Sequence, residues 1–282
     1  MPADLDHPSA GDLLRDVAVY DLASHIVELA TRLAGCPVGL YVVDISGAEL
    51  RRVAGDEALV QRLTIPGAIG PEMAQEQAHD IEEAVSAFAP GLRLVPLWLR
   101  HRAIAALLCD GDPRDSLDDL AREAAAAIEL SAGYTDQFSA ARRRAPVATA
   151  AQLQQDLLPP RIAAARGAEL TGCILPAYDV GGDWFDMSVS ESGAWLGLGD
   201  AVGKGLAAAA LSALAVSAQR SVRQAGESLD DAAWAIHEAV LEGGADEAFM
   251  TIVLAEWNAR DHTLSWINCG HPSPLIRHAD GR

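Results

Sequence analysis

Apolar residues near the start of the chain recur with the period of an α-helix. Leu22, Ile26, Leu29 and Leu33 are three or four residues apart, and Gly35 follows them. This spacing places the four side chains on one helical face, and glycine commonly ends a helix in the left-handed conformation. The pattern predicts that a helix over residues 22–34 opens the first domain.

Four apolar segments then predict two β-hairpins in the same domain. The first joins PVGLYVVD (37–44) to AELRRVAG (48–55), and the second joins LRLVPLWL (92–99) to AIAALLC (103–109). A helix is predicted from Pro71 to Phe88, since proline fits the first turn of a helix. Another is predicted from Ser116 to about Tyr134, because Ser116 and Asp119 have the spacing of a capping box. These elements predict an α+β domain, one sheet flanked by helices, over residues 1–134.

Residues 135–158 are polar and rich in alanine, and Pro146 interrupts them. They predict a linker of two helical pieces. Val147, Ala151, Gln154 and Leu158 form a weak heptad seam. Two interpretations follow, a coil that pairs two copies of the chain or a solvent-exposed spacer, and the spacer is favoured.

The second half of the chain, residues 159–282, predicts a hairpin followed by two helices. DWFDMSV (183–189) and AWLGLGD (194–200) flank the turn sequence SESG. A helix is predicted over residues 206–222, with one apolar face made by Leu211, Leu214, Ala215, Ala218 and Val222. Ser228 and Asp231 then have capping-box spacing before an amphipathic run that ends near Val240. This last helix is expected to cover the sheet.

The balance of charge limits the classes of partner. The formal net charge is -19, which disfavours binding to nucleic acid or to an anionic membrane, because the repulsion acts over the whole molecule. No apolar segment reaches the 18 or so residues that a membrane span needs, and the first residues do not have the pattern of a signal peptide. We therefore expect a cytoplasmic protein with no membrane partner and no nucleic-acid partner.

The four cysteines, Cys36, Cys109, Cys173 and Cys269, are far apart and form no Cys-x-x-Cys motif. This spacing indicates neither a disulfide framework nor a zinc site. We expect four small core residues in a reducing compartment.

The sequence GLGDAVGKG (197–205) is a candidate for phosphate binding. A nucleotide-binding loop needs a glycine five positions before its Gly-Lys pair and a Ser or Thr directly after it. Leu198 and Gly205 occupy those two positions. The nucleotide loop is therefore excluded, and Asp200 becomes the residue of interest.

Asp183 begins one strand of the predicted hairpin and Asp200 ends its partner strand. Antiparallel pairing brings these ends together, and two carboxylates about 4 Å apart repel by about 4 kcal/mol at an effective dielectric constant near 20. A divalent cation with oxygen ligands, Mg²⁺ or Mn²⁺, would relieve this repulsion. Gly181, Gly182, Gly203 and Gly205 would let the backbone approach the ion. Asp186 alternates to the opposite face of the strand, which favours a supporting role over ligation.

Several segments of the second half resemble one protein family. LQQDLLP, GGDWFD, GDAVGKGLAAA and FMTIVLAEWNARDHTLSWINCGHPSPLI look like successive blocks of the bacterial SpoIIE-like branch of the PPM-type (type 2C) metal-dependent serine/threonine protein phosphatases. The resemblance runs from about Gln152 to Arg282. It implies a partial α-β-β-α sandwich that holds two Mn²⁺ or Mg²⁺ ions.

By position in these blocks, the resemblance implies that Asp183 and Asp200 bind metal and that the carbonyl group of Ala201 completes one coordination shell. The metals would activate a water that hydrolyses a phosphoserine or phosphothreonine directly. The usual substrate in the family is a phosphorylated anti-sigma-factor antagonist. His271 could contact the phosphate or donate a proton to the leaving group, or it could only fix its own proline-rich loop. Gly203 and Lys204 could contact the phosphate, although a solvated lysine at a helix start is an equal alternative.

The family pattern continues beyond Arg282 with an Asp-Gly strand end and an Asp-Asp pair that supply further metal ligands. The resemblance therefore implies a domain truncated at its C-terminus, with exposed apolar surface and feeble or no activity. Two non-catalytic alternatives stand beside the enzyme: a phosphoprotein-binding module and a sensor or dimerisation protein.

The element order of the first domain resembles a GAF domain, and the stretch VPLWLRHRAIAALLCDG carries the resemblance. It implies a domain that senses a small molecule or a redox change and regulates the phosphatase. A ligand-free dimerisation module that makes a homodimer is the alternative.

Overall fold

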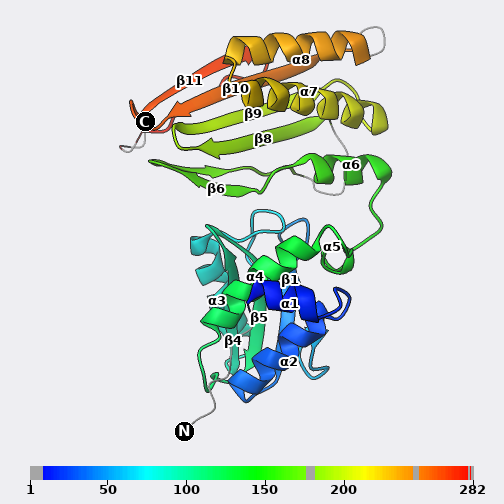
Figure 1. Cartoon of the computed structure of the whole chain (residues 1–282), viewed down its shortest axis with the longest axis vertical. Coiled ribbons are helices and arrows are strands. Elements are labelled where there is room, and N and C mark those ends of the chain that lie inside the picture. Colours follow the sequence, from blue (N-terminus) through cyan, green and yellow to red (C-terminus); the bar gives the residue numbers. More distant parts are fainter. Residues whose placement is uncertain (1–8, 176–181, 244–247, 279, 281–282) are drawn as a thin grey trace. The chain divides into compact units, whose positions relative to one another are not determined.

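The computed structural model describes residues 9–175, 182–243, 248–278 and 280 (Figure 1). The chain divides into two compact units, Met1–Pro146 and Val147–Arg282. Both are built from antiparallel sheets and helices, so the predicted α+β class is confirmed. Within the described ranges, no helix combines the length and apolar character needed to cross a bilayer.

The first unit contains a five-stranded antiparallel sheet in the order β3-β2-β1-β5-β4. Its strands are β1 (Val38–Val43), β2 (Glu49–Gly55), β3 (Arg62–Thr64), β4 (Leu92–Leu99) and β5 (Arg102–Asp110). The two predicted hairpins are β1–β2 and β4–β5, and both are confirmed.

Both faces of this sheet are covered. Helices α1 (Ala10–Asp16), α2 (Leu22–Ala34) and α4 (Asp118–Ser131) pack on one face, and α3 (Gln75–Phe88) packs on the other. The central strand β1 alternates accordingly, with Leu40 and Val42 in the first core and Tyr41 and Val43 in the second. Gly35 ends α2 in the left-handed region at φ 66°, as predicted.

Two predicted helices have different bounds in the structure. The helix expected from Pro71 begins only at Gln75, because Met73 exchanges both backbone hydrogen bonds with Ala103 of β5, at 3.0 and 2.9 Å. That bridge requires extended backbone just before the helix. The helix expected to reach Tyr134 ends at Ser131.

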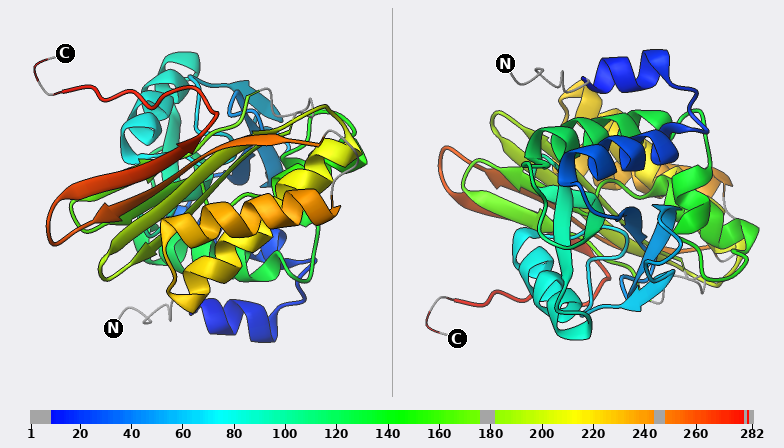
Figure 2. Two further views of the ribbon diagram at one scale, coloured as in Figure 1. Left: turned by 90° about the horizontal axis from the view of Figure 1, so that it is seen from above. Right: turned by 90° about the horizontal axis from the view of Figure 1, so that it is seen from below.

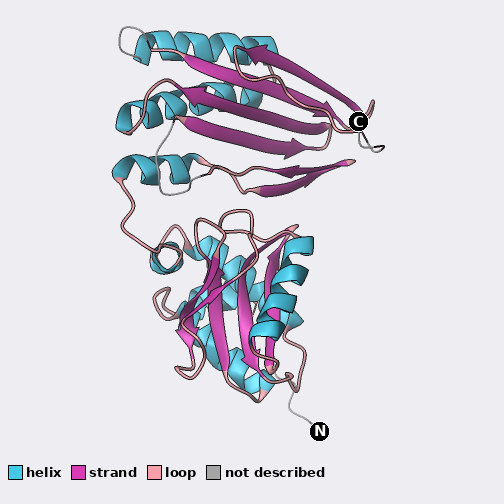
Figure 3. Ribbon diagram, turned by 180° about the vertical axis from the view of Figure 1, so that it is seen from behind, coloured by secondary structure: helices cyan, strands magenta, loops and turns pink. Residues whose placement is uncertain are grey.

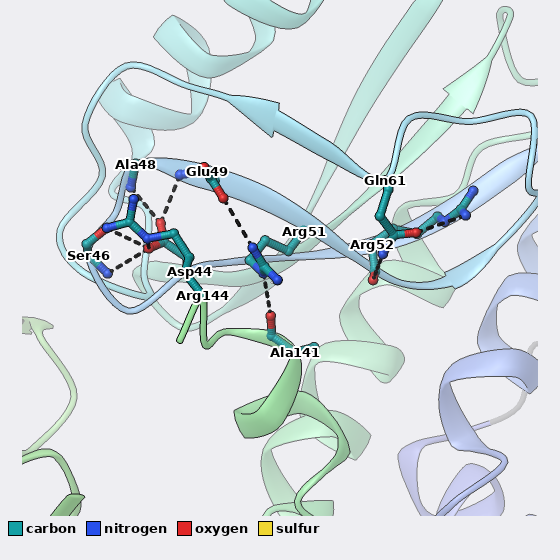
Figure 4. A network of polar contacts seen from close by, with 9 residues as sticks. All are labelled: Asp44, Ser46, Ala48, Glu49, Arg51, Arg52, Gln61, Ala141 and Arg144. Carbon is teal, nitrogen blue, oxygen red and sulfur yellow. Dashed lines mark hydrogen bonds and ion pairs between the residues drawn. The ribbon is translucent and has the colours of Figure 1, made fainter. Parts of the chain in front are cut away.

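Two arginines, Arg142 and Arg144, attach the end of the first unit to its sheet, and Figure 4 shows the contact of Arg144 with Asp44. Asp44 is fully buried; it accepts hydrogen bonds from the N–H groups of Ala48 (2.7 Å) and Glu49 (2.9 Å) and pairs with Arg144 at 3.0 Å. Arg142 donates to the carbonyl oxygens of Pro71 (2.6 Å) and Ile104 (2.7 Å). The segment predicted as a linker is thus shared, since α5 (Gln137–Ala141) packs on the first unit and α6 (Thr149–Leu157) belongs to the second.

The second unit contains a four-stranded antiparallel sheet in the order β11-β10-β9-β8, and β6 and β7 form a separate hairpin. The bounds are β6 (Ile162–Ala165), β7 (Ala168–Thr171), β8 (Asp183–Ser190), β9 (Gly193–Ala201), β10 (Met250–Asn258) and β11 (Thr263–Cys269). Helices α7 (Leu206–Ala225) and α8 (Leu229–Gly243) lie across one face of the larger sheet (Figure 2, left).

The two faces of the larger sheet are covered unequally (Figure 3). Trp184, Ile252 and Leu254 form a core with α7 and α8, whereas Phe185 and Met187 pack on the opposite face in a small cluster with residues around the β6–β7 hairpin. Farther across this second face, Leu198 and Trp266 are 41% and 45% exposed. The described residues of this unit therefore comprise one helical layer, one large sheet and a hairpin, which is part of the expected sandwich.

Two expectations about the core are wrong. Leu214, expected on the buried face of α7, is 38% exposed. The four cysteines are free thiols, but Cys173 and Cys269 are exposed and Cys36 is only partly buried. Of the four, Cys109 alone lies in the core, because it belongs to the interior strand β5.

Candidate metal and phosphate site

The β8–β9 hairpin places Asp183 directly opposite Asp200. The register runs from this pair to Ser190 opposite Gly193, so the turn falls within the predicted SESG sequence. Side chains directly opposite in an antiparallel pair have Cβ atoms about 4.5–5.5 Å apart. The predicted juxtaposition of the two carboxylates is confirmed, and both lie on the face opposite α7 and α8.

A glycine permits the close approach of the strand ends at this point. Ala201 donates its N–H to the Gly182 carbonyl at 3.1 Å. A Cβ atom at position 182 would lie 2.0 Å from the Ala201 carbonyl oxygen, so only glycine fits. The same contact directs that oxygen toward Gly182. The role of Ala201 as a metal ligand stays a prediction, and Gly181 lies outside the described residues.

The glycines of β9 make room on the other face. A Cβ atom at Gly199 would lie 2.8 Å from the Trp184 indole, and one at Gly197 would lie 2.2 Å from the Gln219 side chain of α7. Gly197 therefore makes room for α7 and Gly199 for the indole of the neighbouring strand β8. Sequence reasoning missed this role, because a partner distant in the chain creates it.

The electrostatics of the acidic pair favour a cation. Burial first, and then the neighbouring Asp200 carboxylate, raise the pKa of Asp183, while His271 opposes the rise. Among the described residues of this unit, arginines form ion pairs with Asp186 and not with Asp183 or Asp200. Two adjacent carboxylates without an arginine or lysine partner among these residues suit a hard divalent cation such as Mg²⁺ or Mn²⁺.

The ligand set is small. In the part of the chain that the structure describes, no group of three or more His, Cys, Asp or Glu side chains is arranged to hold a metal ion. The residues therefore fit one cation held by two carboxylates, with water completing its shell. The two ions implied by the resemblance stay a prediction.

Asp186 lies on the opposite face of β8. Its side chain is 2% exposed and forms ion pairs with Arg220 (2.7 Å) and Arg223 (2.8 Å) of α7. A carboxylate with two guanidinium partners joins the strand to the helix and does not need a metal. The sequence predicted the face but not the arginines.

His271 lies at the acidic pair, in the loop that follows β11. Thr251 of β10 is the cross-strand neighbour of Asp200, and its Oγ1 atom lies 2.8 Å from Nδ1 of His271. Asn268 holds the backbone of the loop by accepting from the His271 N–H and donating to its carbonyl, each at 2.9 Å. Asn268 therefore fixes the loop backbone, and Thr251 contacts Nδ1, so Nε2 is the ring nitrogen that can meet another partner. Sequence reasoning missed Thr251, because only the β9–β10 register reveals it.

The loop after Asp200 leads into α7. Gly203 and Gly205 have φ angles of 94° and 75°, and Lys204 is exposed. No side chain caps the start of α7 among the described residues, so its first N–H groups can donate hydrogen bonds to an anion. A separate cavity of about 440 Å³ is lined by Asp183 and His271, together with Cys173, Ile174 and Leu198. It is large enough for a phosphorylated side chain.

Comparisons with known proteins concern the second half of the chain. Residues 190–282 match the family model of Stage II sporulation protein E (SpoIIE). A solved structure, the SiaA-PP2C domain of Pseudomonas aeruginosa, is 21% identical over 42% of this chain and 50% of that chain, with a TM-score of 0.33. The chain thus spans about half the length of that structure. No curated protein matches it. The family match covers Asp200, Lys204 and His271, and it supports the predicted resemblance of this segment to SpoIIE.

Proposed function

We propose that the second unit is a metal-dependent protein phosphatase that hydrolyses phosphoserine or phosphothreonine. The observation that carries the proposal is the pairing of Asp183 with Asp200 on the sheet face opposite the helices, without an arginine or lysine partner among the described residues. The SpoIIE match of residues 190–282 supports the reaction class.

In this proposal, Asp183 and Asp200 hold Mn²⁺ or Mg²⁺, and Ala201 contributes its carbonyl oxygen. When bound, the cation makes a coordinated water nucleophilic near neutral pH and offsets the charge of the phosphoryl oxygens. Thr251 orients the His271 ring through Nδ1, so that Nε2 can contact a phosphoryl oxygen or donate a proton to the leaving serine oxygen. Lys204 and the N–H groups at the start of α7 add positive potential for the phosphate.

The substrate and the regulation follow from the resemblances. We propose a phosphorylated anti-sigma-factor antagonist as the substrate. We propose that the first unit is a GAF-like regulatory domain. It would bind an unknown small ligand or pair two copies of the chain as a homodimer.

A second candidate is a module that binds a phosphoprotein without hydrolysing it. It is favoured by the ligand count, since the described residues bring together only two carboxylates. On that count alone, turnover by this chain is expected to be low.

The test is Mn²⁺-dependent phosphate release from a phosphoserine peptide by the 282-residue chain. Asp200→Asn should abolish the release, whereas Asp261→Asn, the same change at an exposed turn of this unit, should not. Equal release by the wild type and Asp200→Asn excludes the enzyme. Saturable, Asp200-dependent peptide binding without release supports the binding module.

A further inference from the structure

The backbone that carries Asp183 lies at an open edge. β8 is the edge strand of its four-stranded sheet. Ala201 bonds to the carbonyl of Gly182, and peptide groups alternate in direction along a strand. The carbonyl of Asp183 therefore points away from β9 and needs a partner from outside the sheet.

Two helices donate side-chain hydrogen bonds to the backbone carbonyls of Gly182 and Asp183. Gln154 of α6 donates its Nε2 hydrogen to the Asp183 carbonyl at 2.8 Å. Ser212 of α7 donates to the Gly182 carbonyl at 2.7 Å. Both donors are 2% exposed, so water does not compete for these bonds.

Gln154 is an unfavourable residue for simple packing. Its Oε1 atom is buried and has no hydrogen-bond partner among the described residues. A buried acceptor without a partner costs free energy, which an apolar side chain at this place would avoid. The presence of a glutamine at position 154 is therefore explained by its N–H donor, which bonds to the Asp183 carbonyl.

The two helices are also joined to each other. Arg220 of α7 donates to the carbonyl of Leu157 in α6 at 2.9 Å, and the same guanidinium pairs with Asp186 of β8 at 2.7 Å. Arg220 thus connects α6, α7 and strand β8.

We propose that Gln154 is a positioning residue for the acidic pair, with Ser212 as its counterpart on α7. By holding the peptide group of Asp183, Gln154 keeps that carboxylate opposite Asp200 before a cation arrives, so the cation does not have to order the strand end. The role toward the cation rests on the proposed metal site, whereas the role toward the strand end does not.

The test compares Gln154→Met with Gln152→Met in the full chain. Methionine keeps the volume of glutamine and removes the donor, and Gln152, on the same helix, donates to the Asp156 carboxylate instead. Without metal, Gln154→Met should speed amide hydrogen exchange of Ala201 about fivefold, as loss of one hydrogen bond implies. Exchange near the β8–β9 turn should not change. The Kd for Mn²⁺ should rise by a similar factor, and Gln152→Met should leave both quantities within about twofold.

Each outcome decides the proposal. Unchanged Ala201 exchange in Gln154→Met overturns it, and so does faster exchange throughout the sheet, which would show a general structural role. Ser212→Ala should reproduce the local effect if both donors hold the strand end. If the wild type binds no Mn²⁺, the proposed metal site fails, while the metal-free exchange still decides the role of Gln154.

Discussion

Strand β8 carries two aspartates three residues apart whose surroundings are opposite. Asp186 is buried on the helix face and has two arginine partners from α7. Asp183 faces the other way, is only partly shielded from solvent, and meets the like charge of Asp200. The first carboxylate is neutralised by the protein itself, and the second has a neighbour that raises its pKa. The presence or absence of an arginine partner therefore distinguishes Asp186, which supports the fold, from Asp183, which can bind a cation.

Removal of Asp186 should have the largest effect. Asp186→Ala leaves Arg220 and Arg223 without their buried partner, and loss of one member of a buried ion pair costs about 3–5 kcal/mol. Urea unfolding followed by tryptophan fluorescence measures this, because five of the six tryptophans lie in the second unit. Asp261→Ala is the exposed control. A decrease of less than 1 kcal/mol in the free energy of unfolding would show that the arginines find other partners. The contrast between Asp186 and Asp183 would then be wrong.

Much of this contrast could be predicted from the sequence. The alternation of β8 gives the opposite faces of Asp183 and Asp186, and the short SESG turn gives the register with Asp200. Two kinds of contact could not be predicted. The arginines of Asp186 and the Thr251 partner of His271 come from helix packing and from strand order, which local periodicity does not contain. The helix start at Gln75 was missed for the same reason, since the bridge from Met73 to Ala103 joins distant segments.

Removal of Asp200 should act on the cation and not on the fold. Asp200→Asn takes away one of the two anionic ligands, so the Kd for Mn²⁺ should rise at least about tenfold, which corresponds to about 1.4 kcal/mol. Isothermal titration with Mn²⁺ measures the Kd, with Asp261→Asn as the matched control. Metal-free stability should not fall, because directly opposed like charges destabilise a strand pair. A large loss of stability would show that Asp200, like Asp186, stabilises the fold.

Thr251 should have a smaller effect that depends on His271. Thr251→Val keeps the shape and removes the hydroxyl partner of Nδ1, so the ring loses one hydrogen bond, worth about 0.5–1.5 kcal/mol. We expect phosphate release to fall about two- to tenfold at unchanged Kd for Mn²⁺. The nitrogen chemical shifts of the ring should change as its tautomers redistribute. Unchanged shifts would show that Thr251 does not orient the ring.

The smallest expected effect is the pH dependence of metal-free stability. The pKa of Asp183 is raised in the folded state, so between its usual value of 3.8 and the raised value the folded chain binds more protons than the unfolded chain. Stability from this group is therefore complete below pH 3.8 and falls as the pH rises through the raised pKa. The pKa of Asp231 is lowered by hydrogen bonds from Ser228, so Asp231 changes stability with pH in the opposite direction. The pH dependence of the wild type alone therefore does not isolate the contribution of Asp183. The difference between wild type and Asp183→Asn removes the contribution of Asp231, because only Asp183 and its interaction with Asp200 change. Urea unfolding at a series of pH values should show the wild type losing stability relative to Asp183→Asn as the pH rises, and saturating Mn²⁺ should reverse the loss. A difference that grows in the other direction would mean that Asp183, like Asp186, already has a positive partner.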